Sequence, residues 1–394
     1  MSDRPQAVIV SAARTPMGSF TGAFSSIPAT RLGSLAIREA WARTGLPGDR
    51  IDNVLMGCVL SAGLGQAPAR QAAIGAGLPQ GVGAVTVNKV CGSSLQTVIM
   101  AARMVALGEA SVVIAGGMEN MTRAPYLLEK ARQGYRLGHG ELTDSLIKDG
   151  LWDVYNQFHM GNAGELCAAK FRFSRQEADD FALESYARAK QAIAEGRFTR
   201  EIVPVEVPQK KGPPLPVRDD EEPHRADLAK LRQLKPVFQE DGVLTVGNSP
   251  SCNDGAAAVV VMAEAEARRH GLTPMARIAG YAGAALAPEW FSLAPVEAIS
   301  RLLRNTTLSI ADIDLFEINE AFSVVSLAIT RELGLDPKKV NVHGGAVALG
   351  HPIGATGARI LTTLLHAMES RDVRRGVASL CIGGGEALAL MVER

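Results

Sequence analysis

The chain has 394 residues, enough for two or three domains or for one large composite fold with a substantial core. Hydrophobic residues make up 47% and charged residues 21% of it, a composition that excludes a disordered or fibrous protein. Lys and Arg together number 41, as do Asp and Glu, so no net positive charge draws the chain to nucleic acid or to an anionic membrane. We therefore expect neither of these as a partner.

The N-terminal residues predict no secretory leader, because they run into only a short strand-like stretch, VIV. No apolar run reaches the roughly 18 residues that a membrane span needs. The five cysteines are odd in number, widely spread and free of zinc-ligand spacing. Free thiols are typical of a reducing compartment, so we expect a cytoplasmic protein with no bound metal.

Short apolar stretches rich in β-forming residues alternate along the chain with Ala-rich stretches. This alternation predicts an α/β fold with buried sheets. Strands are expected near residue 7 and from Asn53, Ser111, Leu315 and Ala378. Apolar residues at helical spacing predict covering helices over residues 32–42, 95–107, 321–333 and 358–368.

The middle of the chain, from Thr122 to about Asn248, is richer in charged and aromatic residues than its flanks. We interpret it as an insertion of loops with a pair of helices, one of them over Arg175 to Glu195. The charged run RDDEE within it is typical of a solvated turn.

The two ends of the chain resemble each other. GEASVVIAGG (Gly108 to Gly117) aligns with GVASLCIGGG (Gly376 to Gly385), and each follows a glycine-bearing helix start, at Cys91 and at Gly354. The repeat predicts two similar α/β halves, with the insertion carried by the first. The expected division is 1–121 for the first part of the N-terminal half, 122–249 for the insertion with the return to that half, and 250–394 for the C-terminal half.

Cys91 lies in VNKVCGSSLQ, where a strand-like stretch meets the start of a helix. Free backbone N–H groups at a helix start stabilise a thiolate and can also hold an oxyanion. A lone cysteine is more often a small buried core residue. The Gly and Ser residues that follow Cys91 leave room for a substrate, which favours a nucleophile.

A thiol nucleophile needs a base, and His351 is the best placed of the seven histidines, between two glycine-rich segments and just before a proline. Cys381 lies where a strand runs into three consecutive glycines, which let backbone N–H groups face a ligand. Glycine triplets also occur where strands simply pack closely. Asn319 ends another strand, where it could orient a water or cap the next helix.

Together these segments closely resemble the thiolase family, and within it the acetyl-CoA acetyltransferase branch. The resemblance rests on VNKVCGSS, NEAF, GGAVALGHPIGATGARI and CIGGGEA, with NDGAAA at Asn253 and HMG at His159. It runs from Val8 to the C-terminus with the motifs in order. It implies the thiolase fold, in which two βαβαβαββ halves form five layers (αβαβα) and an inserted loop domain extends from the first half.

The resemblance also implies roles for the catalytic residues. Cys91 would take the acyl group from one acyl-CoA, while His351 would activate Cys91 and protonate the departing CoA thiolate. Cys381 would remove the α-proton of a second acetyl-CoA, and its glycine-rich surroundings with His351 would favour the thiolate that this needs. Two oxyanion sites are implied, one from His351 with a water held by Asn319, the other from the N–H groups of Cys91 and Gly383. No cofactor is implied, because coenzyme A is a substrate and product.

By the same resemblance, coenzyme A would lie against the insertion, with Arg225 as a partner for a phosphate. An exposed arginine in a charged loop is the plainer interpretation of Arg225. The positions that match coenzyme A contacts are Leu151, His159, Met160, Arg225, Ala321 and Phe322.

Two departures from the family pattern affect the ligands. Pro250 stands where the family has a serine, so either Ser249 or Ser251 supplies the hydroxyl that contacts pantetheine or pantetheine binds differently. Pro223 stands where a potassium-dependent branch has a tyrosine, so no potassium site is inferred.

The resemblance favours the reversible Claisen condensation of two acetyl-CoA to acetoacetyl-CoA and CoA, a reaction of lipid metabolism. A broader-chain 3-ketoacyl-CoA thiolase of fatty-acid β-oxidation is the alternative, since Phe291 stands at the acyl pocket and Glu386 replaces the usual small or apolar end of the glycine motif. A catalytically silent thiolase-like scaffold is a third possibility, which the intact cysteines and histidine disfavour. The family also implies a homo-oligomer, a dimer or a homotetramer.

Overall fold

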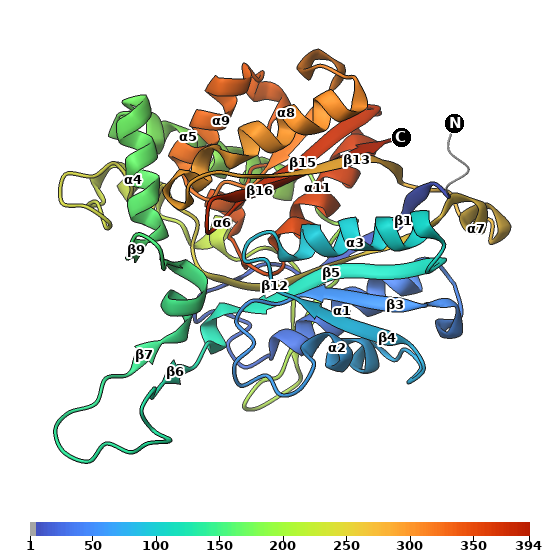
Figure 1. The fold of residues 1–394 in the computed structure, drawn as a ribbon, viewed down its shortest axis with the longest axis horizontal. Helices are drawn as coiled ribbons and strands as arrows, with labels where there is room; N and C mark the ends of the chain where they lie inside the picture. Colours follow the sequence, from blue (N-terminus) through green and yellow to red (C-terminus); the bar gives the residue numbers. More distant parts are fainter. Residues whose placement is uncertain (1–4) are drawn as a thin grey trace.

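The computed structural model describes residues 5–394 as a mixed α/β fold around one large sheet, whose strands fall into two groups (Figure 1). In each group the pairs at the outer edge are parallel and those nearer the centre are antiparallel. The N-terminal group has the order β4 (Gly83–Val87), β3 (Asn53–Gly57), β5 (Val112–Asn120), β12 (Asn253–Ala263) and β1 (Ala7–Arg14). The C-terminal group has the order β14 (Leu315–Ile318), β15 (Arg375–Ile382), β16 (Glu386–Glu393) and β13 (Ala276–Ala285).

The two groups meet through a short pairing of β1 with β13. Only Val8 with Arg277 and Ile9 with Ala276 are partners there. Outward from this join the strands follow the same order, β1, β12, β5 and β3 on one side and β13, β16, β15 and β14 on the other. The prediction of two similar halves is therefore confirmed.

The equivalence of the halves corrects the alignment of the strand repeat. At the start of β5 the N–H of Val112 donates to Asp52, and at the start of β15 the N–H of Arg375 donates to Asp314 in the same way. Val112 is thus equivalent to Arg375. The sequence repeat instead aligns Val112 with Leu380, which lies five residues after Arg375. The strand part of the alignment was wrong because both strands are buried and draw on the same few small and aliphatic residues.

Helices form three layers around the two halves of the sheet. The outer face of the N-terminal half is covered by α1 (Ala29–Ala42) and α2 (Pro68–Ala76). The central layer consists of α3 (Ser93–Leu107) and α11 (Thr356–Ser370), which pack against each other, and the outer face of the C-terminal half is covered by α8 (Ala294–Thr306) and α9 (Ser323–Leu333). This is the αβαβα arrangement that the resemblance to thiolases implies.

Strand β12 shows why these strands are almost wholly apolar. Val260 and Met262 point into the cluster under α1, while Val259 and Val261 point into the central cluster with α3 and α11. Successive side chains of a strand face opposite sides, so both faces of β12 are buried. Each such side chain contributes roughly 1.5–3 kcal/mol by leaving water.

The segment Val90–Leu107 passes as a membrane span by length and hydropathy alone. In the fold it forms the helix α3 and the turn before it, and the helix packs against α11 between the two halves of the sheet. A core helix buried on several sides has the same composition.

Between β5 and β12 the chain forms short hairpins and helices, and the helix expected over Arg175 to Glu195 is present as α5 (Arg175–Ala194). A capping box of Ser174 and Glu177 begins it. The other elements of this segment are β6 (Tyr126–Leu127), β7 (Thr143–Asp144), β8 (Trp152–Asp153), β9 (Phe158–His159), α4 (Met160–Phe171), β10 (Val205–Val207), β11 (Leu215–Val217) and α6 (Glu222–Arg225). Elsewhere lie β2 (Gly18–Ser19), α7 (Glu264–Arg269) and α10 (Ala346–Leu349). Short 3₁₀ or π segments span Gly48–Arg50, Met121–Arg123, Leu146–Leu151, Leu228–Gln233, Pro288–Leu293, Ile310–Asp312 and Pro337–Lys339.

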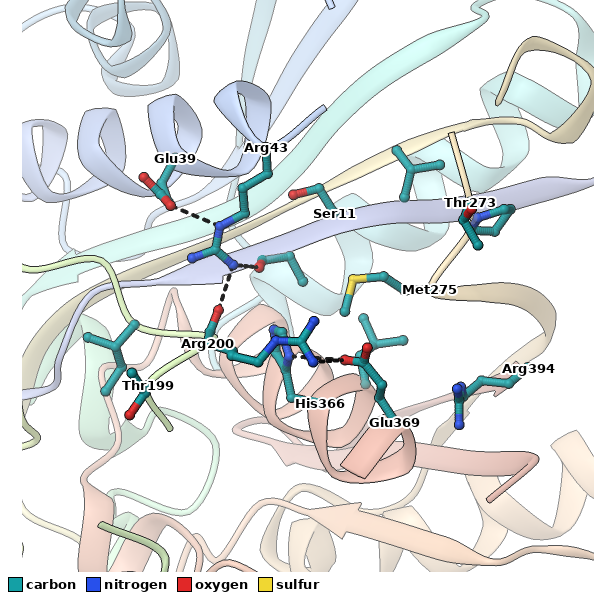
Figure 2. A pocket seen from close by; sticks show the side chains of 15 residues that line it. Ser11, Glu39, Arg43, Thr199, Arg200, Thr273, Met275, His366, Glu369 and Arg394 are labelled. Atoms are coloured by element: carbon teal, nitrogen blue, oxygen red, sulfur yellow. Dashed lines mark hydrogen bonds and ion pairs between the residues drawn. The ribbon is translucent and has the colours of Figure 1, made fainter. Parts of the chain in front are cut away.

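A polar cavity of about 580 Å³ opens beside the join, past the point where β1 stops pairing with β13 (Figure 2). Inside it Arg43 pairs with Glu39 and Arg200 pairs with Glu369, so each carboxylate already has a cationic partner. The last turns of α11 line this cavity, whereas His351 precedes the first turn of that helix. The length of α11 therefore separates the cavity from the predicted catalytic residues.

Candidate active site

Cys91 lies in a strained turn between β4 and α3. Val90 has φ +46°, a left-handed conformation that costs a β-branched residue roughly 1–3 kcal/mol. The Ser93 hydroxyl stabilises the turn, because it accepts a hydrogen bond from the N–H of Lys89 at 2.8 Å and donates one to the carbonyl of Val90 at 2.6 Å. The turn places the Cys91 thiol just before α3, where the sequence predicts a nucleophile.

His351 is buried and lines the same cavity as Cys91. Its Nδ1 lies 2.7 Å from the hydroxyl of Thr356, and that hydroxyl lies 2.9 Å from the carbonyl of Pro352. A hydroxyl has one proton, which it gives to the carbonyl, so Nδ1–H donates to Thr356 and Nε2 keeps its lone pair. Burial lowers the pKa of His351 to about 3, so the ring is a neutral base at physiological pH.

Cys381 is the penultimate residue of β15 and is only 1% exposed. It lies close enough to Cys91 that a charge on the Cys91 sulfur raises the pKa of Cys381. The backbone N–H groups of Gly383 and Cys91 face the Cys91 sulfur and lower its pKa. These are the two N–H groups from which the sequence predicts an oxyanion site.

Burial outweighs these N–H groups. It raises the pKa of Cys91 to about 11, and it raises the pKa of Cys381 well above the ordinary value for a thiol. For Cys381 this direction is opposite to the expected thiolate near neutral pH, because loss of hydration disfavours the anion more than the nearby N–H groups favour it. Both thiols are therefore protonated at neutral pH, and each needs a base in order to react.

Asn319 is fully buried after β14, and among residues 5–394 neither atom of its amide has a hydrogen-bond partner. Leaving such a group unpaired costs roughly 1–3 kcal/mol. A water molecule, which both donates and accepts, is the partner that this amide lacks. The free amide thus fits the predicted role of Asn319 in holding a water.

A mostly apolar cavity of about 350 Å³ brings most of the predicted residues together. Cys381 and Asn319 do not line it. Arg225 lines a neighbouring cavity of about 470 Å³, and Val246 belongs to the walls of both. The predicted residues that line the first cavity are Cys91, Leu151, His159, Met160, Ser249, Phe291, Ala321, Phe322, His351 and Gly383.

Phe238 is the main wall residue that sequence reasoning missed. Its ring stacks on His159 with 5.1 Å between centroids and meets Phe322 edge-on at 5.8 Å. Gly161 makes room for it, since a Cβ there would lie 2.3 Å from the Phe238 ring. The glycine of the HMG motif was the one available signal of this close approach. Other wall residues that the sequence did not single out are Met121, Gly150, Val237, Val246 and Ile353.

The two serines that flank Pro250 differ in their hydrogen bonds. The hydroxyl of Ser251 donates to Asn253 at 2.9 Å, and the same Asn253 oxygen accepts the backbone N–H of His351. The hydroxyl of Ser249 is buried in the cavity wall and has no partner within residues 5–394. Ser249 is therefore the serine with a hydroxyl free for a ligand.

Metal ligands and disulfides do not account for the site. Within residues 5–394, no group of three or more His, Cys, Asp or Glu side chains is placed to hold a metal ion. All five cysteines are free thiols. The groups at the cavity that can act on a substrate include the Cys91 thiol, the His351 imidazole and the backbone of Gly383.

Comparison with known proteins agrees with this geometry. The chain matches the family models described as the thiolase N-terminal domain over residues 7–265 and the thiolase C-terminal domain over residues 272–394. It is 51% identical over 388 residues to an acetyl-CoA acetyltransferase of Pseudomonas aeruginosa, with 98% of this chain and 99% of that protein covered. It is also 51% identical to acetyl-CoA acetyltransferase 2 of Arabidopsis thaliana, covering 98% and 96% of the two chains. The crystal structure of the Bacillus anthracis acetyl-CoA acetyltransferase superposes with a TM-score of 0.96 at 40% identity, over 99% of each chain. The chain therefore belongs to the thiolase family.

Proposed function

We propose that this protein is an acetyl-CoA C-acetyltransferase, an acyltransferase that reversibly condenses two acetyl-CoA molecules to acetoacetyl-CoA and CoA. The observation that carries the proposal is that the thiol of Cys91 and the neutral imidazole of His351 line one cavity, with Cys381 near enough for a charge on the Cys91 sulfur to raise its pKa. The acetyl-CoA acetyltransferases to which the chain is about half identical support the choice of acyl group.

In the first half-reaction, Nε2 of His351 takes the thiol proton of Cys91 while the sulfur attacks the thioester carbonyl of acetyl-CoA. The negative oxygen is held by the N–H groups of Cys91 and Gly383, and one such donor lowers a barrier by about 3 kcal/mol. The tetrahedral intermediate then collapses to acetyl-Cys91, and the departing CoA sulfur takes the proton back from His351.

In the second half-reaction, Cys381 gives its proton to His351 and its thiolate removes an α-proton from the second acetyl-CoA. A water held by Asn319, together with His351, stabilises the enolate oxygen. The carbanion attacks acetyl-Cys91, acetoacetyl-CoA forms, and the released Cys91 thiolate recovers a proton from the imidazolium.

The cavity wall supports a binding mode for coenzyme A. The stacked rings of His159, Phe238 and Phe322 offer an apolar surface for the pantetheine chain, and the unpartnered hydroxyl of Ser249 offers one hydrogen bond. Arg225 lies in the next cavity, within the reach of a long ligand, and would pair with a phosphate there.

The acetyl group is the acyl chain that the cavity favours. Phe291 is 3% exposed, and its ring meets that of Phe322 edge-on with 6.4 Å between centroids. Together with Met160, these two rings narrow the cavity. The test is the rate of CoA-dependent thiolysis over a series of 3-ketoacyl-CoA substrates. Turnover confined to acetoacetyl-CoA supports the proposal, rates that hold or rise with chain length indicate a broader thiolase, and no turnover on any substrate indicates a scaffold.

We also propose a homotetramer in a reducing cytoplasm. The outer edge of β4 is unpaired within the described chain and Val85 on it is 46% exposed, which supports pairing with a second copy. The β6–β7 hairpin extends away from the body (Figure 1), and Tyr126 and Leu142 on it are exposed apolar residues suited to a further contact. Light scattering on the purified protein tests the assembly, and the free thiols support the compartment.

A further inference from the structure

Glu119, the penultimate residue of β5, is a fully buried carboxylate. Its two oxygens accept hydrogen bonds from the backbone N–H groups of Gly354 at 2.9 Å, Val59 at 3.0 Å and Leu60 at 3.1 Å. No cation pairs with it within residues 5–394, so these N–H groups, with the Cys58 thiol at 3.8 Å, are what compensates its loss of hydration. A charged acceptor makes hydrogen bonds roughly twice as strong as a neutral one.

The segments that Glu119 holds are both part of the active site. Val59 and Leu60 follow β3 and pack with Ile353 in one apolar cluster, against which Cys91 also packs. Gly354 is three residues after His351 and begins the approach to α11. One carboxylate thus joins a segment of the N-terminal half to the catalytic loop of the C-terminal half.

The peptide of Gly354 fits tightly against the strand ends. A Cβ at Gly117 would lie 2.1 Å from the carbonyl oxygen of Gly354, and one at Gly57 would lie 2.6 Å from it. A Cβ on Gly354 itself would lie 2.5 Å from a carboxylate oxygen of Glu119. The carbonyl side of this peptide is therefore set by close packing, and the N–H side is set by Glu119 alone.

We propose that Glu119 is a positioning residue of the active site: its carboxylate fixes the loop that carries His351 in register with the turn that carries Cys91. The inference rests on the proposed function. Glu119 acts through backbone groups and does not touch the reacting atoms. A displacement of about 1 Å between a base and its nucleophile costs on the order of 100-fold in rate.

The charge of Glu119 supplies a second readout, because it works against the nucleophile. The Glu119 carboxylate raises the pKa of Cys91, in the same direction as burial does. It also raises the pKa of Cys58, the other thiol that faces it. A group that served only to activate Cys91 would carry the opposite charge.

The first experiment compares Glu119→Gln with Asp52→Asn. Asp52 also accepts backbone N–H groups of β5, but at the opposite end of that strand, away from the cavity. In Glu119→Gln we expect kcat for thiolysis of acetoacetyl-CoA to fall about 10- to 100-fold, with KM for CoA unchanged because the aromatic wall is untouched. The pH midpoint for alkylation of Cys91 by iodoacetamide moves down. Asp52→Asn keeps the wild-type kcat and midpoint.

A second variant separates position from charge. Glu119→Asp keeps the carboxylate but shortens it by one methylene, so it cannot reach all three N–H groups. We expect a low kcat with no downward shift of the alkylation midpoint. A wild-type kcat in Glu119→Asp would mean that charge, and not position, is what Glu119 supplies.

A kcat for Glu119→Gln within twofold of wild type, or an equal loss in Asp52→Asn, would overturn the inference. If Glu119→Gln does not fold, Gly354→Ala decides, because its Cβ displaces the same carboxylate, and an unchanged kcat there would also count against it. If the wild-type protein shows no thiolysis at all, the proposed function fails by itself. The alkylation midpoints of Cys91 then test Glu119 alone, and equal midpoints in wild type and Glu119→Gln overturn its role.

Discussion

The starts of the two central helices, α3 and α11, are equivalent in the two halves but do different work. Each lies on the end of a strand from the other half: a Cβ at Gly92 would lie 2.4 Å from Ile382 of β15, and one at Gly354 would lie 2.5 Å from Glu119 of β5. Glu119 and Ile382 are equivalent, since each lies seven residues after the paired strand starts at Val112 and Arg375. The start of α11 thus packs against a buried carboxylate, whereas the start of α3 packs against an apolar side chain.

The difference shows how a duplicated fold divides positioning from chemistry. At Gly117, two residues before Glu119, the strand end is closed, because the Gly354 peptide fills the space beside it. Past Ile382 the chain continues into glycines, and a Cβ at Gly383 would meet no atom closer than 3.6 Å. In the proposed mechanism the closed end would hold His351 in place, and the open end would leave room for a thioester beside Cys91.

The largest expected effect separates the two thiols at the open end. Cys91→Ala removes the nucleophile, so acetyl-CoA should leave no acetyl group on the protein and thiolysis should fall by more than about 1,000-fold. Cys381→Ala keeps the nucleophile, so it should be acetylated but should fail to condense. Intact-protein mass spectrometry after mixing with acetyl-CoA measures the first step, and acetoacetyl-CoA formation measures the second. Equal acetylation of both variants would overturn the assigned roles.

A smaller effect is expected at the hydrogen bond that orients the base. Thr356→Val has nearly the same shape but removes the acceptor for Nδ1–H of His351. Without it the ring can turn or change tautomer, and we expect kcat to fall at least about 10-fold. Steady-state thiolysis of acetoacetyl-CoA gives the value.

The control for this variant is Thr306→Val. The Thr306 hydroxyl donates to the carbonyl of Leu302 within α8 and contacts no predicted site residue. It should keep the wild-type kcat, and a matching loss there would point to a general effect of removing a threonine hydroxyl.

The two strand ends should also respond differently to one added methyl group. Gly117→Ala forces a Cβ against backbone at the closed end, so we expect the free energy of unfolding to fall by about 3 kcal/mol. Gly383→Ala places its Cβ in ordinary van der Waals contact with Val90 and Met160, so stability should stay near that of wild type while activity falls, because the methyl group narrows the cavity. Urea unfolding and thiolysis rates on both variants check the contrast. A stable Gly117→Ala protein would show that the closed end can give way.

Sequence patterns predicted the parts of the molecule that depend on local order. The residues that indicate a role for Cys91 and for Cys381 are neighbours in the sequence, within about ten residues of each cysteine. The two halves were predicted because each contains a glycine-bearing helix start, a helix and a buried strand in the same order. The helices are α3 and α11. The structure places most of the predicted site residues around one cavity, while their catalytic roles stay predictions.

What the sequence missed depends on contacts between distant segments. Strands β12 and β16 have no polar alternation, because both faces are buried, so the period of two that marks a strand is hidden. Phe238 enters the site from an irregular loop, and its partner Gly161 lies in another element. Glu119 is one acid in the short motif GGMEN, and its N–H partners come from positions as far apart as Val59 and Gly354.

The smallest expected effect is a change in how stability depends on pH. Burial raises the pKa of Glu119 to about 7 from an ordinary 4.5, so the folded protein binds this proton more tightly than the unfolded chain does. The resulting stability is present below about pH 4.5 and is lost as the pH rises through 7. Glu119→Gln lacks this titration, so its free energy of unfolding should fall less between about pH 5 and 7.5, by roughly 2 kcal/mol. Asp254 and Glu317, whose pKa values burial raises to about 6 and about 8, act in the same direction in both proteins and cancel in the difference.

Urea unfolding at the two pH values measures this change in the free energy of unfolding. Ile382→Val is the control, because it lies at the equivalent strand end and its side chain does not titrate. Equal pH slopes in wild type and Glu119→Gln would mean that the three N–H groups offset the burial of this carboxylate completely.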